Sequence, residues 1–334
     1  MGNLTVQWKQ ELNLGIVLRE EGRLPESSER FERAIALARQ HANLEGEAYG
    51  WMGLGTIAAL RGNWAEAREH LDRALLLADQ IGDGLLAGYA AGSVQMLFRY
   101  RGEWEKALEQ SERLLAEAGE NVISRASRGL QRAGVLLDLG DVAGAREDIR
   151  ATELVGQQSG PAGLDESVLF ALGLLSEASS EYDEAERSYR THLQRARDTG
   201  DRIDVMEMLL VLGDLLMQKQ AGNAVAMFDE AASIAEDAGL PQTAAYAACM
   251  AALSRDEDAG TARRVLAPWE ENLDMKDRMR ARWRLWQASG DPADLAGAKR
   301  LLQYLVDHAP ARYRETMIKN VPMYQEIAAA RPTT

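Results

Sequence analysis

The chain has 334 residues, of which 52 are acidic and 38 basic, so its formal net charge is −14. Neutralising a nucleic-acid backbone requires a basic face, and this balance therefore argues against a nucleic-acid partner. No run of about 18 apolar residues occurs, so we expect neither a transmembrane helix nor a membrane partner. The single cysteine, Cys249, excludes an internal disulfide and fits a reducing compartment; we expect a small buried residue in a cytoplasmic protein.

A spacing of about 40 residues organises the chain from its start. The pair Leu-Gly recurs at one position of this spacing, and Gln95 and Ala133 occupy the two positions without it. Four glycines that are expected to end helices keep the same spacing. A repeat of this length is typical of stacked helical hairpins, which form a binding surface rather than a pocket around one reaction. The Leu-Gly pairs are Leu14-Gly15, Leu54-Gly55, Leu172-Gly173 and Leu212-Gly213, and the turn glycines are Gly22, Gly62, Gly102 and Gly140.

Residues 46–82 show the repeat unit most clearly. Apolar residues at helical spacing predict a first helix over Glu47–Leu60 and a second over Trp64–Gln80. Gly62 lies between them and suits the left-handed position that follows a helix. The small residues Gly55 and Ala67 are expected to face each other where the helices cross. Further hairpin turns are expected near Gly22, Gly102, Gly140, Ser180 and Ala221.

After Pro241 the repeat signal weakens. Two divergent hairpins are predicted, one from Ala244–Leu253 and Thr261–Leu273 and one from Met279–Ala288 and Asp294–His308. Pro268 is expected to kink the second of these four helices. A short terminal helix is expected to cover the apolar face of the last hairpin. The predicted organisation is thus six hairpins over 1–240, two divergent hairpins over 241–308, and a cap and tail over 309–334.

The N-terminal end shows no matching cap. Trp8 and Leu12 begin an amphipathic helix almost at once. Either this face is tolerated, or a further domain precedes it in a longer parent chain. We favour the second interpretation.

The repeat unit resembles the tetratricopeptide repeat (TPR) family. The resemblance rests on six units in phase, and in the clearest one on Trp51, Leu54 and Gly55 followed by Ala67, Leu71 and Ala74. Units of about 40 residues exceed the common unit of about 34. They look like the helical arms of bacterial signalling ATPases and of Ser/Thr kinase-linked regulators. The resemblance implies an all-α, right-handed superhelical solenoid of TPR-like hairpins with a C-terminal capping helix.

Motifs of catalytic and metal sites are not found in this sequence. The four histidines are scattered, and neither H-x-x-x-H nor C-x-x-C occurs, so no metal site is predicted. Gly53-Leu54-Gly55 lacks the third glycine of a dinucleotide fingerprint, and no phosphate-binding loop or G-x-S-x-G elbow is present. We therefore expect no cofactor and no enzyme activity.

The family geometry also implies which side chains line the concave groove. In the first three units these side chains form an aromatic, methionine-containing and basic wall. Tyrosine and arginine contribute strongly to interface energies, and methionine adapts to varied partners. The other interpretation is that the tyrosines and methionines only pack between repeats. The predicted binding residues are Lys9, Arg19, Tyr49, Met52, Tyr89, Met96, Arg99 and Tyr100.

Two functions fit these features. The favoured one is a non-catalytic scaffold or sensor module of a bacterial signalling system that binds a protein or peptide. The alternative is a ligand-gated regulator, in which a peptide or small molecule enters the groove and changes the superhelical pitch. Peptide-pheromone receptors of the resembling family work in this way.

Overall fold

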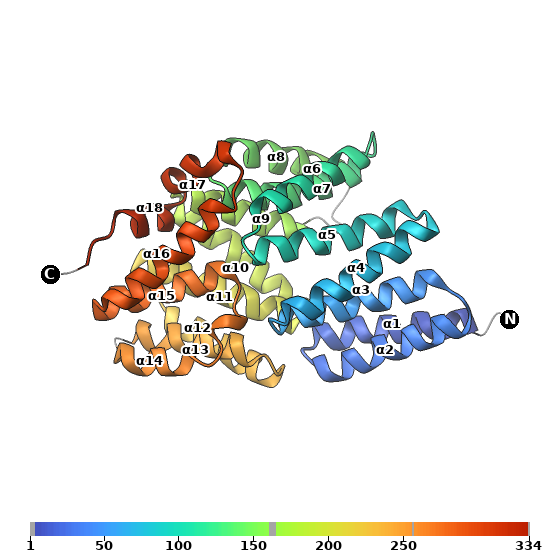
Figure 1. Cartoon of the computed structure of the whole chain (residues 1–334), viewed down its shortest axis with the longest axis horizontal. Helices are drawn as coiled ribbons and strands as arrows, with labels where there is room; N and C mark the ends of the chain where they lie inside the picture. Colours follow the sequence, from blue (N-terminus) through green and yellow to red (C-terminus); the bar gives the residue numbers. More distant parts are fainter. Residues whose placement is uncertain (1–3, 160–164, 256, 333–334) are drawn as a thin grey trace.

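The computed structural model describes residues 4–159, 165–255 and 257–332, and over these ranges the chain is helical and contains no strand (Figure 1). The helices are α1 (Leu4–Glu20), α2 (Leu24–Gln40), α3 (Leu44–Leu60), α4 (Trp64–Ile81), α5 (Gly84–Tyr100), α6 (Trp104–Glu117), α7 (Val122–Asp138), α8 (Val142–Ser159), α9 (Asp165–Ala178), α10 (Tyr182–Thr199), α11 (Arg202–Lys219), α12 (Ala224–Asp237), α13 (Pro241–Ser254), α14 (Ala259–Leu266), α15 (Met275–Ser289), α16 (Pro292–Asp307), α17 (Arg314–Asn320) and α18 (Pro322–Ala329). None of the helices described is both long and apolar enough to cross a membrane.

Within the described residues, α1 to α16 pair in sequence as antiparallel hairpins, and each hairpin packs on the next. The predicted turns are confirmed. Gly22, Gly62, Gly102 and Gly140 all have positive φ, as do Ser180 and the two residues that flank Ala221. A positive φ is the conformation that ends a helix and favours glycine. The predicted all-α solenoid is therefore confirmed.

The recurring glycine makes room for a large side chain from the second helix of its own hairpin. A Cβ on Gly55 would lie 2.7 Å from Cγ of Leu71, and one on Gly15 would lie 2.7 Å from the Phe31 ring. Phe228 fills the same place above Gly213. Gly55 faces Ala67, whose carbonyl oxygen would lie 3.4 Å from a Cβ on Gly55, but the nearest side chain is Leu71.

The third hairpin reverses this arrangement. Gln95 stands where the other units have a small residue, and Ser111 stands where they have a large one. Both are buried, and the Gln95 amide donates a hydrogen bond of 3.2 Å to the Ser111 hydroxyl. The unit that looks degenerate in sequence therefore keeps the same packing volume, with the large side chain moved to the opposite helix.

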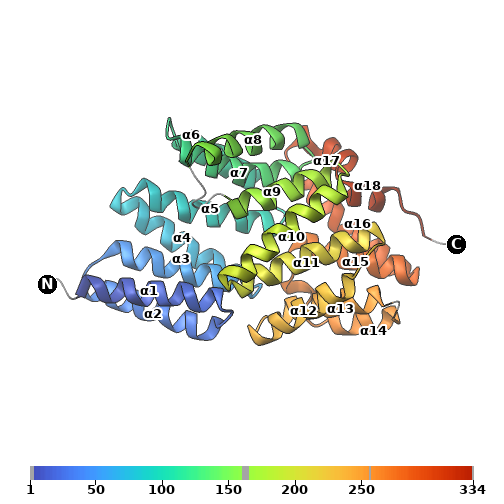
Figure 2. The same ribbon diagram turned by 180° about the vertical axis from the view of Figure 1, so that it is seen from behind.

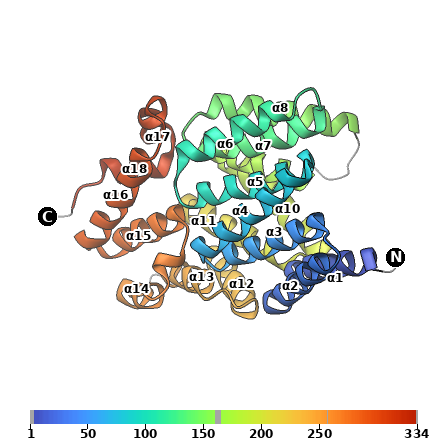
Figure 3. The same cartoon turned by 45° about the vertical axis from the view of Figure 1, so that its right-hand side comes forward.

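The solenoid curves until its C-terminal hairpins meet the turns of its N-terminal ones. Figures 1 and 3 show the orange helices of the C-terminal part to one side of the blue helices α1 to α4, and Figure 2 shows α9 to α11 joining the two parts from behind. Gln242 donates to the Leu60 carbonyl at 2.5 Å, and Asn320 donates to the Gly140 carbonyl at 2.8 Å. These contacts join the turns at Gly22, Gly62, Gly102 and Gly140 to the chain from Arg202 onward. We call them the closing seam.

The C-terminal part departs from one sequence prediction. The helix expected over Thr261–Leu273 ends at Leu266, and Pro268 stops it rather than kinking it. Proline lacks the N–H that the next helical turn needs. A short 3-10 turn, η1 (Glu270–Asn272), follows.

The capping helix is present. Helix α18 packs on α16, where Tyr324 and Ile327 join Leu302 and Leu305 in one buried cluster. Another 3-10 turn, η2 (Ala311–Tyr313), leads into the cap.

Candidate functional site

The first helices of the hairpins form the inner surface of the solenoid. Helix α1 packs on α3, α3 on α5, and α7 on α9, whereas the second helices of neighbouring hairpins pack on one another less closely. This asymmetry places the odd-numbered helices on the concave side. We call the inner surface of α1, α3, α5, α7, α9 and α11 the concave groove.

The eight predicted binding residues all lie on α1, α3 and α5, and none is fully buried. Tyr89 and Met96 are 47% and 43% exposed. Lys9 is exposed as well, and its ammonium lies 5.1 Å from the Trp8 ring. The other five, Arg19, Tyr49, Met52, Arg99 and Tyr100, are half-buried.

Helix α5 supplies the most open part of this wall. Tyr89, Met96 and Tyr100 lie at helical spacing along this helix. The Tyr100 hydroxyl donates to the Met96 sulfur at 3.2 Å. The Arg128 guanidinium lies 5.9 Å from the Tyr89 ring. Burial raises the pKa of Tyr49 on the neighbouring helix. This surface offers aromatic and thioether groups to a ligand.

The basic component of the predicted wall is mostly compensated. Arg99 pairs with Asp138 at 2.5 Å, and Asp138 also accepts from Lys276 at 2.8 Å. Arg19 lies 3.6 Å from Glu20. Of the three predicted cations, only Lys9 has no carboxylate partner among the described residues. Although burial opposes it, the charges of Arg99 and Lys276 lower the pKa of Asp138. Arg99 therefore joins α5 to α7 and α15, and is not a free cation.

Carboxylates line the deep end of the concave groove. Arg280 pairs with Asp214 at 2.9 Å and with Asp277 at 2.7 Å, and the Tyr246 hydroxyl donates to Asp214 at 3.1 Å. Burial raises the pKa of Asp214 and of Glu177, and burial together with Asp274 raises that of Asp277. This end is a polar network that holds α11, α13 and α15 together.

A second wall of the groove begins with the first turns of α11. Glu207 is open to solvent and has no ion-pair partner among the described residues. Partial desolvation of this carboxylate within the groove, together with the charges of Asp204 and Asp201, raises its pKa to about 7. Asp204 itself lies 2.8 Å from Nε2 of the buried His192. The aromatic wall thus belongs to the same groove as an acidic one.

Sequence reasoning missed the contribution of α15. Asp138, Glu177, Glu207 and Asp214 occupy repeat positions that the family geometry directs inward, so a charge tally at those positions signals an acidic groove. Lys276, Asp277 and Arg280 carry no such signal, because the repeat is too divergent there to assign positions.

The rest of the described chain offers no metal centre. No group of three or more histidine, cysteine, aspartate or glutamate residues within it could hold a metal ion. Cys249 is fully buried, and burial raises the pKa of its thiol. The predicted small buried cysteine is confirmed.

Comparisons with known proteins agree with the repeat. The tetratricopeptide repeat family model matches residues 168–203, which contain the α9/α10 hairpin. No curated protein matches the sequence. Among solved structures, a Rap protein complexed with Competence and Sporulation Factor has 14% sequence identity, covers 98% of each chain, and has a TM-score of 0.55.

A second similar structure is a Signal Transduction ATPase with Numerous Domains from Pyrococcus horikoshii, which has a tetratricopeptide repeat sensor. It shares 14% identity over 89% of this chain and 52% of that one, with a TM-score of 0.51. The chain therefore spans about half the length of that ATPase. At such identities the likeness concerns the fold. The predicted resemblance to tetratricopeptide-repeat proteins is confirmed: residues 168–203 match the family model, and the described part of the chain has the helical-repeat fold.

Proposed function

We propose that the chain is a non-catalytic interaction module that binds a peptide or protein segment along its concave groove. The observation that carries this proposal is the wall of α3 and α5. Tyr89 and Met96 remain 47% and 43% exposed there, and the half-buried side chains of Tyr49, Met52 and Tyr100 lie on the same two helices. Exposed tyrosine beside an adaptable thioether is costly in water and valuable in an interface.

A role as the sensor or scaffold arm of a bacterial signalling system in the cytoplasm fits this module. The ATPase of similar fold has its tetratricopeptide repeats as a sensor, which supports the same use here. In that case the module changes its partner's state through contact and performs no chemistry of its own.

A second candidate function is a ligand-gated regulator, and the closing seam favours it. The seam joins α7 and the α3–α4 turn to the C-terminal hairpins through Asp138–Lys276 and Gln242–Leu60. A ligand between the walls of the groove competes with or reinforces these contacts. The Rap protein of similar fold was solved with Competence and Sporulation Factor bound, which supports a regulator of this kind.

Selection from a library of displayed heptapeptides tests the interaction module. We expect enriched peptides, and we expect Tyr89→Ala with Met96→Ala to weaken their binding at least tenfold while the melting temperature changes little. The control is Leu76→Ala with Leu154→Ala, which removes apolar side chains that are even more exposed, from α4 and α8. Full binding by the Tyr89/Met96 variant contradicts the groove assignment.

Small-angle scattering of the same complexes separates the two candidates. A scaffold keeps its radius of gyration when an enriched peptide saturates it. A ligand-gated regulator changes its radius, and the variant Lys276→Met, which opens the seam at Asp138, then shifts the free protein toward the bound shape.

A further inference from the structure

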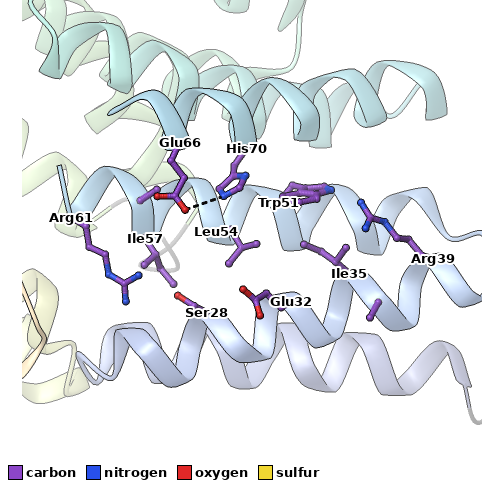
Figure 4. Close-up of a pocket in the computed structure, with 12 residues that line it drawn as sticks. Ser28, Glu32, Ile35, Arg39, Trp51, Leu54, Ile57, Arg61, Glu66 and His70 are labelled. Carbon is purple, nitrogen blue, oxygen red and sulfur yellow. Dashed lines mark ion pairs between the residues drawn. The ribbon is translucent and has the colours of Figure 1, made fainter. Parts of the chain in front are cut away.

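The outer surface of the first two hairpins contains a groove of about 400 Å³. It lies between α2 and α4, which are the second helices of their hairpins, and α3 forms its floor (Figure 4). Along α2 it runs from Ser28 to Arg39, which at 1.5 Å per helical residue is roughly 16 Å. We call this cavity the outer groove. It does not share a lining residue with the eight predicted residues of the concave groove.

The floor of the outer groove is apolar and fixed in place. Ile35 and Ile57 contribute side chains from α2 and α3. Trp51 lies beside them, and its indole N–H donates to Glu47 at 3.1 Å. The His70 ring lies 4.9 Å from the Trp51 ring. A floor held by these contacts is preorganised, so a ligand would not have to order it.

The two carboxylates beside this floor, Glu32 and Glu66, have no lysine or arginine partner among the described residues. Arg39 is already engaged by Glu47 at 2.7 Å. Glu32 has no hydrogen bond or ion pair within the described chain. Glu66 accepts a hydrogen bond from the Asn63 amide at 3.1 Å and lies 3.6 Å from His70, which is charged only when protonated. Figure 4 shows Glu32 and Glu66 reaching into the groove from opposite walls. A cation between them would meet two carboxylates above an apolar surface.

The two ends of the groove differ from its middle. Arg61 stands at one end without a carboxylate partner among the described residues, and Arg39 stands at the other. The lining therefore alternates from basic to acidic to basic along its length. A length of roughly 16 Å corresponds to about five residues of extended chain at 3.3 Å each.

We propose that the outer groove is a second binding site, and that it takes an extended peptide segment in which a lysine or arginine lies next to an apolar side chain. The basic group lies between Glu32 and Glu66, and its apolar neighbour covers Trp51 and Ile57. The two arginines leave space for acidic groups or backbone carbonyls at the ends of the segment. This site is independent of the concave groove.

The test uses two libraries of acetylated, amidated pentapeptides. One has lysine in the centre with leucine, isoleucine, valine or phenylalanine beside it, and its twin has glutamate in the centre. We expect the protein to retain peptides from the lysine library and not from the twin. A retained peptide changes the tryptophan emission, and Trp51→Phe removes that change.

Two substitutions locate the binding. Glu32→Lys reverses an exposed, unpaired charge in the groove and is expected to weaken binding about tenfold. Glu29→Lys is the matched control, because Glu29 is exposed on the same helix and lies outside the groove. Ala36→Trp fills the groove from an exposed lining position and is expected to abolish binding. The Tyr89/Met96 double variant is expected to bind as the parent does.

Several results overturn the proposal. The proposal is wrong if the protein retains no lysine peptide, or if it retains the glutamate library equally well. It is also wrong if Glu32→Lys and Ala36→Trp bind the peptides as the parent does. Loss of binding in the Tyr89/Met96 variant alone places the peptides in the concave groove instead. Equal affinity for arginine amide, a small cation without a chain, makes the outer groove a small-molecule site and contradicts a peptide site.

Discussion

The regular hairpins α1 to α12 and the divergent helices α13 to α18 are held together in different ways. In the first region a glycine on one helix receives a large side chain from the next, as Gly55 receives Leu71. In the second region the buried carboxylate of Asp294 accepts from Arg263 and from Arg282, and Arg282 also pairs with Glu270. The regular region depends on shape, which repeats in sequence. The divergent region adds buried paired charges to its apolar core, and these do not repeat in sequence.

Removing residues 310–334 tests the comparison most severely. Met317, Tyr324 and Ile327 are fully buried in the cluster that contains Leu305, and burying each such side chain is worth about 1.5–3 kcal/mol. We expect a large fall in melting temperature and self-association in size-exclusion chromatography. A truncated chain that stays monomeric and melts as before contradicts the role of the cap.

Asp294→Ala tests the charge-based part of the comparison. Asp294 is completely buried, and its removal leaves Arg263 and Arg282 without a shared acceptor. Removing one partner of a buried pair costs about 3–5 kcal/mol. Chemical denaturation measures this loss, and Asp291→Ala, which removes a more exposed partner of Arg263 together with the N-cap of α16, is the control. Equal effects of the two changes would show that burial of the pair is unimportant.

Gly55→Leu tests the shape-based part. The new side chain would overlap Leu71, and overpacking costs about 1–3 kcal/mol. In the third hairpin the reversed pair allows a sharper test. Gln95→Gly and Ser111→Leu each disrupt a buried hydrogen bond, and together they restore the common pattern. Thermal melts of both single variants and the double variant should show favourable coupling, and strict additivity would contradict volume exchange.

The smallest effect concerns pH and Glu207. Because its pKa is raised in the folded state, the folded protein holds its proton more tightly than the unfolded chain. Its contribution to stability is present below its ordinary pKa and is lost as pH rises toward 7. Glu207→Gln should therefore raise the melting temperature slightly at pH 8 and leave it unchanged at pH 4. Since this side chain is open to solvent, we expect a small change.

The sequence predicts those features whose cause is local. The turn glycines, the hairpins up to α12 and the buried Cys249 follow from spacing and side-chain size, so they could be predicted. The helix predicted over Thr261–Leu273 is too long. The helical pattern of apolar residues continues past Pro268, but the backbone cannot continue the helix there.

The candidate site was less accessible to sequence reasoning. The eight predicted residues lie on α1, α3 and α5, and their role in binding stays a prediction. The pairing of Arg99 with Asp138 and Lys276 could not be predicted, because it depends on α15 crossing the chain from far along the sequence. The outer groove also escaped notice, since Trp51 reads as a packing residue of the repeat.

The closing seam changes how this solenoid should unfold. In an open array each repeat contacts only its neighbours, so the array can fray from either end. Here Gln242 reaches the Leu60 carbonyl across 182 positions of sequence, and Thr316 reaches the Leu139 carbonyl across 177. Such contacts make the folding nucleus non-local and slow, and they link the first hairpins to the last. Amide hydrogens of α3 and α13 are therefore expected to exchange together, as parts of one cooperative unit, rather than in order along the chain.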